Sequence, residues 1–254
     1  MKKFLIVLVL IISSLNYAQN QNRKLVWEEN FDSKMLNRDS WNFDIGNGCP
    51  DLCGWGNNER QIYTETNHTL KDGNLIIQAQ LENDVFTSTK ITTKGKKQFL
   101  YGRFEARAKL PVGHGLWPAF WMLGSNISTI GWPKCGEIDI LEYIGREPHM
   151  VFTSLHTQDS HGETINTKKT KFDTIEEGYH IYAMDWTKDK IEFFVDSKLV
   201  YTFQPNIKND DTWPFNQPFY LIVNLAVGGN FGGPEVDKSV FPQQFNIDYI
   251  KVYQ

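Results

Sequence analysis

The chain has 254 residues, of which 41% are hydrophobic and 22% are charged, with a formal net charge of −4 at neutral pH. This composition is that of a folded protein rather than a disordered one, and a negative charge without a basic stripe argues against a nucleic-acid partner. Aromatic residues make up 14% and include 8 Trp. That exceeds the needs of a core of this size, so some are expected to face a ligand such as a sugar, whose C–H face stacks on an indole ring.

The amino terminus has the three parts of a secretory signal peptide. Lys2 and Lys3 precede an apolar run over 4–12, and a cleavage site follows at Ala18. The run is too short to span a bilayer, so no membrane insertion is expected. The predicted division of the chain is a signal peptide over 1–18, a short segment over 19–24 and a single domain over 25–254. The mature protein is expected to be soluble, secreted and monomeric.

The three cysteines divide into a close pair and a single residue. Cys49 and Cys53 flank Pro-Asp-Leu, where an oxidising compartment permits a disulfide. Two free thiols or a metal site remain open for this pair, although the segment supplies few further metal ligands. Cys135 leads into an apolar segment, and we interpret it as a packed thiol.

Short apolar or alternating runs recur along the chain, separated by Gly, Asn, Asp and Pro. In 101–110, small or apolar residues alternate with Tyr, Arg, Glu and Lys, which predicts a strand with one buried face. Further strands are predicted over 74–80, 179–186, 191–195, 199–203, 219–227 and 245–253, with a hairpin loop over 196–198. No long segment has a helical period. The pattern predicts an all-β antiparallel sandwich.

The run over 219–227 is nearly continuous in apolar residues, as in a central strand covered on both faces. Asn224 interrupts it. Its side chain either bonds to backbone within the core or lines a cleft.

The segment over 136–145, Gly-Glu-Ile-Asp-Ile-Leu-Glu-Tyr-Ile-Gly, sets three acids among β-forming residues. On a strand, Glu137 and Asp139 share a face, whereas strict alternation turns Glu142 to the other one. One extra residue at the pair Ile140 and Leu141 would form a β-bulge and return Glu142 to the side of the other acids. Three acids on one face repel one another, which indicates a site.

Two carboxyl groups about 5 to 5.5 Å apart are the requirement for retaining glycoside hydrolysis. Glu137 is the candidate nucleophile and Glu142 the candidate acid/base, with Asp139 hydrogen-bonded to Glu137 and sharing a proton. The competing interpretations are a charged edge strand, which normally also carries Lys or Arg, and a calcium loop, which is richer in Gly and Asn.

Flanking motifs give the chain a resemblance to a known family. They are Gly-His-Gly-Leu-Trp-Pro-Ala-Phe-Trp-Met-Leu over 113–123, Gly-Trp-Pro-Lys-Cys-Gly over 131–136, Trp-Gly-Asn-Asn-Glu over 55–59 and Asn-Leu-Ala-Val-Gly-Gly over 224–229. With the acidic segment they resemble glycoside hydrolase family 16 from residue 25 onward. The extra residue before the last Glu is similar to the laminarinase branch rather than to the lichenases, which have the shorter Glu-x-Asp-x-Glu.

The resemblance implies a β-jelly roll of two curved antiparallel sheets with a polysaccharide lying across the concave one. It implies Glu137 as nucleophile, Asp139 as helper and Glu142 as acid/base, with no cofactor for catalysis. The implied substrate-binding residues are Asn57, Glu59, Arg103, Trp117, Trp121, Trp132, His156 and Asn224. Trp117 and Trp132 are expected to stack on glucose rings, alternation could turn Trp121 inward, and a lone His such as His156 is otherwise more often a core residue.

The resemblance also implies a structural Ca²⁺ far from the cleft, bound through Asn30, Gly73 and Asp248. The expected activity is endo-hydrolysis of β-1,3-glucan, with mixed-linkage β-1,3/1,4-glucan as a further substrate. Three alternatives stay open: the same chemistry on agar, carrageenan or porphyran, a glucan-binding module without catalysis, and transglycosylation. Intact acids argue against the second, and a negative net charge argues against sulfated galactans.

Overall fold

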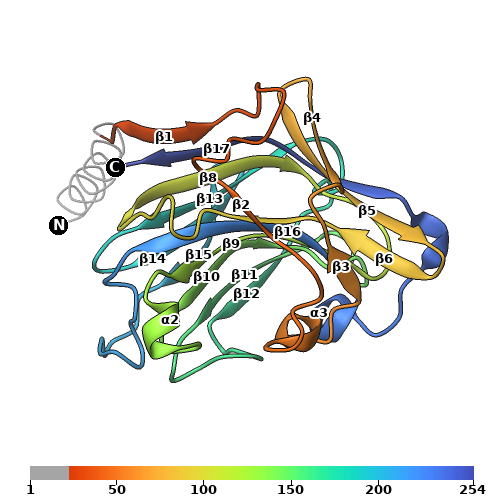
Figure 1. Ribbon diagram of the computed structural model, residues 1–254. Helices are drawn as coiled ribbons and strands as arrows, with labels where there is room; N and C mark the ends of the chain where they lie inside the picture. The colour runs from red at the N-terminus through yellow and green to blue at the C-terminus, as the bar shows by residue number, and fades with distance from the viewer. Residues whose placement is uncertain (1–22) are drawn as a thin grey trace.

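A computed structural model describes residues 23–254, and Figure 1 shows them as two curved sheets, one above the other. The predicted signal peptide over 1–18 and residues 19–22 of the following segment lie outside the described residues. Within the described part, no helix is long and apolar enough to cross a membrane.

The seven-stranded sheet carries the residues that matter most below. Its strands, in spatial order, are β12 (Thr167–Lys171), β11 (Met150–His156), β10 (Glu137–Glu142), β9 (Leu116–Gly124), β16 (Phe219–Val227), β7 (Lys90–Thr92) and β2 (Asn42–Asp44). All of its pairings are antiparallel.

The ten-stranded sheet packs against it. The order is β15 (Lys198–Phe203), β14 (Ile191–Val195), β13 (His180–Trp186), β8 (Gly102–Lys109), β17 (Gln243–Tyr253), β5 (Asn74–Glu82), β6 (Val85–Ser88) and β3 (Gln61–Tyr63), with β1 (Leu25–Glu29) on β17 and β4 (His68–Lys71) on β5. Among the described strands, β3 and β6 form the one parallel pair. The short helices are η1 (Cys53–Gly56), α2 (Ile127–Ile130), α3 (Gly229–Gly232) and η2 (Lys238–Val240).

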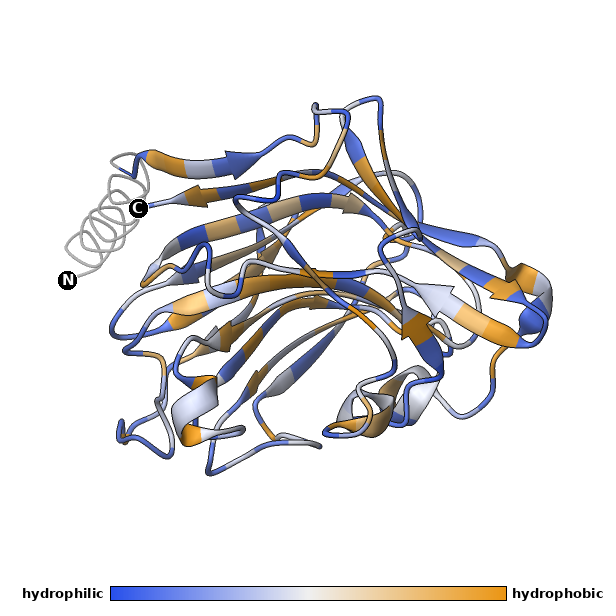
Figure 2. Cartoon of the chain, in the orientation of Figure 1, coloured by the Kyte–Doolittle hydropathy of each residue, from blue (hydrophilic) through white to orange (hydrophobic). Residues whose placement is uncertain are grey.

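Hydrophobic patterning explains the two layers. Phe104, Ala106 and Ala108 of β8 point into the core between the sheets, while the charged residues that alternate with them lie on the outer face. Figure 2 shows β8 banded in this way, and β16 as an almost continuous apolar strand broken near its middle. Over residues 23–254, the predicted all-β sandwich is confirmed, with its strands and without a long helix.

Both faces of β16 are buried, as its sequence predicts. Leu221 and Val223 belong to the core between the sheets, and Tyr220 and Ile222 belong to a smaller apolar cluster on the opposite face. We call that opposite, outer face of the seven-stranded sheet the site face. Asn224 alternates with Ile222 and therefore lies on the site face rather than between the sheets.

The hairpin between β14 and β15 differs slightly from the expected loop. Asp196 and Ser197 both have positive φ, 47° and 67°, as a two-residue turn with the twist of the flanking strands requires. Lys198 already pairs with Val195, so it begins the next strand and is not part of the loop.

Candidate active site

The bulge expected in β10 is present. Opposite β9, Asp139 pairs with Trp121, Leu141 pairs with Phe120 and Glu142 pairs with Ala119, so one extra residue, Ile140, interrupts the register. Ile140 and Leu141 are both buried in the core between the sheets. Strict alternation would instead place the Glu142 carboxyl there, at a cost of several kcal/mol for an ion without a partner. The bulge keeps both apolar side chains buried and returns Glu142 to the site face.

Glu137 lies at the beginning of β10 and contacts the N–H edge of an indole ring. The Nε1–H of Trp132 donates a hydrogen bond to its Oε2 at 2.6 Å. Burial, followed by the negative charge of Asp139, raises the pKa of Glu137 to about 7, against the opposing influence of His156 and the Trp132 hydrogen bond. Near neutral pH this carboxyl therefore exchanges its proton readily, and its ionised form already has a donor in place.

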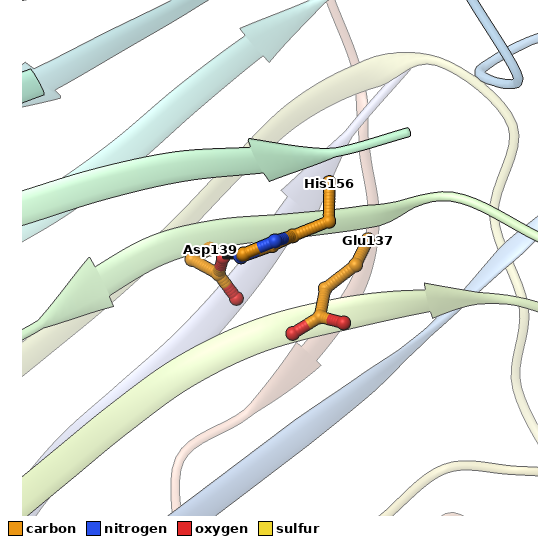
Figure 3. Close-up of side chains that lie close together, drawn as sticks. All are labelled: Glu137, Asp139 and His156. Atoms are coloured by element: carbon orange, nitrogen blue, oxygen red, sulfur yellow. Dashed lines mark ion pairs between the residues drawn. The ribbon is translucent and has the colours of Figure 1, made fainter. Parts of the chain in front are cut away.

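His156 of β11 is the cation among the acids. Its Nε2 lies 3.1 Å from Asp139 Oδ2, and Figure 3 shows the two side chains together with Glu137 beside them. Burial lowers the pKa of His156, but Asp139, Glu137 and Glu142 outweigh that cost and raise it to about 10. The imidazolium offsets one of the negative charges, so His156 is a site residue and not an ordinary core histidine.

Glu142 is buried, with 8% of its surface exposed. Its Oε1 accepts a hydrogen bond from Trp117 Nε1 at 3.0 Å, and Ser154 Oγ lies 3.4 Å from its Oε2. Burial, then the charges of Asp139 and Glu137, raise its pKa well above the usual value, with His156 opposing. Glu142 therefore keeps a proton at a pH where an exposed Glu has lost it, which is the property of a general acid.

A second hydrogen-bond network lies on the site face next to these acids, since its first member, Trp121, pairs in register with Asp139. Trp121 Nε1 donates to Asn224 Oδ1 at 2.7 Å, and Asn224 Nδ2 donates to the Tyr63 hydroxyl at 3.0 Å. That hydroxyl donates to Glu59 Oε2 at 3.2 Å, while Asn57 Nδ2 lies 3.4 Å from Glu59 Oε1. Burial raises the pKa of Glu59. Four residues predicted to bind substrate thus form one connected set.

Glu137, Asp139 and His156 could also present ligand atoms to a cation, since one atom from each lies within 4.8 Å of the others. Within the protein, Asp139 already has the His156 cation as an ion-pair partner and Glu137 already has the Trp132 donor, while His156 Nδ1 has no hydrogen-bond partner among the described residues. We therefore assign them to acid–base chemistry.

Comparison with known proteins agrees with this geometry. The model of the family described as glycosyl hydrolases family 16 matches residues 56–251. The chain belongs to glycosyl hydrolase family 16. It is therefore a glycoside hydrolase, as the acids on β10 indicate.

Solved and curated relatives cover nearly the whole chain. A crystal structure of laminarinase from Flavobacterium sp. UMI-01 superposes with a TM-score of 0.90 at 68% identity, covering 91% of this chain and all of that one. A beta-glucanase of Rhodothermus marinus is 41% identical over 251 residues, which is 91% of this chain and 85% of the relative. A glucan endo-1,3-beta-glucosidase of Cryptopygus antarcticus is 37% identical over 89% of this chain and 90% of its own length.

Within this family 16 fold, the three predicted cleft tryptophans all lie on the site face. Trp117 and Trp121 alternate with core residues of β9, so Trp121 does not turn inward. Trp132 is 47% exposed and makes an edge contact with His161, with ring centroids 5.3 Å apart. Its exposed surface beside Glu137 is available for stacking on a sugar ring.

The prediction that Arg103 binds substrate is wrong. Arg103 lies on β8 of the ten-stranded sheet, where its guanidinium pairs with Glu105 at 3.1 Å and with Asp185 at 3.3 Å. The physical reason is the alternation of β8: Phe104 and Ala106 point into the core, so Arg103 points to the outer face of the sheet remote from the acids.

The predicted calcium residues lie in or beside the ten-stranded sheet: Asp248 is on β17, Asn30 follows β1, and Gly73 is in the turn between β4 and β5, remote from the acids. A Cβ built on Gly73 would lie 3.9 Å from the carbonyl oxygen of Asn30 and 3.1 Å from Oδ1 of Asp32, so these groups fit a shared oxygen site. Asp248 fits less well, because its Oδ2 is paired with Arg107 at 2.5 Å. Nothing in the acid cluster depends on this corner.

Of the alternatives for the close cysteine pair, the structure has the disulfide. Cys49 and Cys53 form a disulfide. Cys135 is a free, buried thiol, and burial followed by the charge of Glu137 raises its pKa to about 11, which suits a packed thiol and not a nucleophile.

Sequence reasoning missed Lys90 and Phe231. Lys90 is buried, pairs with Asp44 at 3.2 Å and lies 4.2 Å above the ring of Trp55. Phe231 makes edge contacts with Trp117 and Phe152, at 5.4 and 5.0 Å between ring centroids. A lone Lys in a short strand and a Phe in the segment Gly-Gly-Asn-Phe carry no local signal, and only the pairing of Lys90 with Asn224 and the packing of Phe231 on Trp117 place them on the site face.

Proposed function

We propose that this protein is a secreted retaining endo-hydrolase of β-1,3-glucan that also cleaves mixed-linkage β-1,3/1,4-glucan. One observation carries the proposal: the bulge at Ile140 brings the carboxyls of Glu137 and Glu142 to the same face, with Asp139 between them. The relatives named laminarinase and glucan endo-1,3-beta-glucosidase support the choice of polymer. The predicted signal peptide over 1–18 supports secretion.

In the first step, an oxygen of Glu137 attacks the anomeric carbon and the bond to the leaving oxygen breaks. Glu142 gives its proton to that oxygen. Trp132 donates to the nucleophile's other carboxylate oxygen and keeps it oriented, while the His156–Asp139 pair limits the repulsion that the ionised nucleophile meets.

In the second step, Glu142 is a carboxylate and takes a proton from water. The hydroxide attacks the anomeric carbon, the ester bond to Glu137 breaks, and the configuration at the anomeric carbon is restored. Both acids are then in their starting states, so apart from water the cycle needs no group from outside the chain.

A panel of polysaccharides tests the function. We expect laminarin to be cleaved to short oligosaccharides from internal positions, mixed-linkage glucan to be cleaved more slowly, and agar, carrageenan and porphyran to remain intact. Reducing-sugar release with product sizing measures both the polymer and the mode of cleavage. Faster turnover of a galactan would replace the proposed substrate, binding without turnover would make the protein a glucan-binding module, and longer products would indicate transglycosylation.

Two variants belong in the same experiment. Glu137→Ala is expected to lower laminarin hydrolysis by roughly four orders of magnitude or more, since a nucleophile is removed, with thermal unfolding still cooperative. Glu192→Gln is the matched control, because Glu192 lies on β14 of the other sheet and pairs with Lys190. Near wild-type activity of Glu137→Ala would refute the mechanism.

We further propose that Ca²⁺ has a structural role at the corner formed by Asn30 and Gly73. A chelator is then expected to lower the melting temperature while kcat on laminarin below that temperature stays unchanged. An unchanged melting temperature on chelation and on addition of Ca²⁺ would refute this site.

A further inference from the structure

Two hydroxyl groups, those of Ser154 and Thr167, lie in line next to the Glu142 carboxyl. Ser154 Oγ lies 3.4 Å from Glu142 Oε2, and Thr167 Oγ1 donates to Ser154 Oγ at 3.0 Å. Ser154 is buried on β11, with 3% of its surface exposed, while Thr167 lies on the exposed edge strand β12. The two hydroxyls therefore form a chain from the edge of the sheet to Glu142.

The two oxygens of Glu142 have different kinds of neighbour. Trp117 meets Oε1 with an indole N–H, which can only donate. The proton of the acid form cannot lie between Oε1 and that ring, so the Trp117 contact favours the acid form that carries its proton on Oε2. Ser154 faces Oε2 with a hydroxyl, which can donate to a carboxylate and can also rotate to accept from a carboxylic acid.

We propose that Ser154 and Thr167 are positioning residues for the acid/base, whose hydroxyls reorient each time Glu142 loses or gains its proton. When Glu142 is ionised, Ser154 donates to Oε2 and Thr167 donates to Ser154. When Glu142 is protonated, the Ser154 hydroxyl turns its hydrogen away from Oε2. Its oxygen then either accepts a hydrogen bond from the Oε2 proton or no longer contacts that proton. This inference rests on the proposed retaining hydrolysis, in which Glu142 changes protonation state twice in each turnover.

No charged neighbour of Glu142 can take over the role of the Ser154 and Thr167 hydroxyls. The titratable groups that face Glu142 are Glu137 and Asp139 on its own strand and His156 on β11. β9 contributes the uncharged Trp117, and Lys169 of β12 is engaged by Glu147. Ser154 is thus the neighbour of Oε2 that can both donate and accept.

A purely structural role is the competing explanation, because Ser154 of β11 and Thr167 of β12 are also paired across the two strands. A measurement of the Glu142 pKa distinguishes the positioning role from the structural one. A donor to the carboxylate favours the charged form and lowers the pKa, so loss of that donor raises it further. Loss of a strand contact changes stability without changing that pKa.

The test measures the pKa of Glu142 by ¹³C NMR of Glu-labelled protein, assigned with Glu142→Gln, and the pH profile of kcat/KM on laminarin. In Ser154→Ala we expect the pKa of Glu142 and the upper limb of the profile to rise by about half a unit to one unit. Ser154→Thr should restore both. Thr167→Val should shift both in the same direction by less, and it acts at an exposed position that tolerates the change.

Thr153→Val is the matched control, since Thr153 is the neighbouring residue of β11, is buried, and its hydroxyl has no hydrogen-bond partner within the described residues. It should leave the Glu142 pKa unchanged. In Ser154→Ala we also expect kcat on laminarin to fall about tenfold, with a smaller loss on a dinitrophenyl laminaribioside, whose leaving group needs no proton.

The same Glu142 pKa in Ser154→Ala and in the wild-type protein would overturn the inference. Failure of the proposed function is a separate result: a wild-type protein that cleaves no glucan refutes that function, while the NMR comparison still decides whether Ser154 acts on Glu142.

Discussion

Two charged clusters lie on opposite sheets of this molecule and differ in how their charges are balanced. On the ten-stranded sheet, Arg23 and Arg103 both pair with Asp185, and Arg103 also pairs with Glu105. Two cations meet two anions there. On the site face, Glu137, Asp139 and Glu142 share one cation, His156.

The difference separates a structural cluster from a functional one. A set of partly buried ions with matched partners can be explained by folding alone. Three acids with one cation oppose folding, because burial and mutual repulsion raise the pKa values of Glu137 and Glu142. A cluster that costs stability in this way is expected at a functional site, where groups with raised pKa values take part in acid–base catalysis.

Moving the acid by one position is expected to have the largest effect. The double variant Leu141→Glu, Glu142→Leu places the carboxyl at a position that points into the core between the sheets. We expect laminarin hydrolysis to disappear and the free energy of unfolding to fall by several kcal/mol, measured by activity and thermal unfolding. Deletion of Ile140 is the comparison, because it gives the strictly alternating Glu-x-Asp-x-Glu spacing and keeps the last acid on the site face. Wild-type activity in the double variant would show that the bulge does not place the acid.

Asp139→Asn should follow in size. It keeps the shape of the side chain and removes the charge that raises the pKa of Glu142, so the upper limb of the pH–rate profile should move to lower pH. With the partner of His156 also weakened, we expect kcat to fall on the order of a hundredfold. An upper limb that stays in place would contradict the assigned coupling.

The corresponding change on the other sheet is Asp185→Asn. Arg23 and Arg103 then lose their shared carboxylate, and we expect the free energy of unfolding to fall by about 1–3 kcal/mol. The kcat on laminarin should be unchanged, since no site residue is touched. A shifted pH–rate profile in this variant would show that the cluster on the ten-stranded sheet also takes part in catalysis, which contradicts its assignment as structural.

The last prediction concerns stability alone: Glu137→Gln, which lacks the nucleophile, is expected to be more stable than the wild-type protein at high pH. The folded-state pKa of Glu137 is raised from 4.5 to about 7, so the folded state holds this proton more tightly and wild-type stability falls as pH rises through that window. The glutamine side chain of the variant does not ionise, so the stability of the variant does not fall in this pH range. Its melting temperature should exceed that of the wild-type protein at pH 8, and the difference should shrink toward pH 4.5. A pH-independent difference would contradict the raised pKa.

The sequence was sufficient for the fold class and for the acids, because both depend on local pattern. Alternation over 101–110 and the apolar run over 219–227 predict strands and their buried faces, and the five-residue separation of Glu137 and Glu142 requires a bulge. The error at Arg103 shows the limit. Alternation states that Arg103 points away from the core, but two sheets have two outer faces, and the motif alone could not choose between them.

Lys90 and Phe231 show what pairing adds. Lys90 reaches the site because β7 pairs with β16 and aligns Lys90 with Asn224, which is aligned in turn with Ala119 and Glu142. Phe231 reaches it because α3 follows β16 and packs against Trp117. These contacts join residues far apart in the chain, so no local window contains them.

The most direct test of the central claim is to trap the glycosyl-enzyme with a 2-deoxy-2-fluoro laminaribioside that carries a good leaving group, and to locate the label by peptide mass spectrometry. We expect one 2-fluorolaminaribiosyl group on Glu137, with none in Glu137→Gln, and β-configured products in the first minutes of laminarin hydrolysis by ¹H NMR. A label on Glu142, or α-configured first products, would contradict the mechanism proposed for the two glutamates of β10.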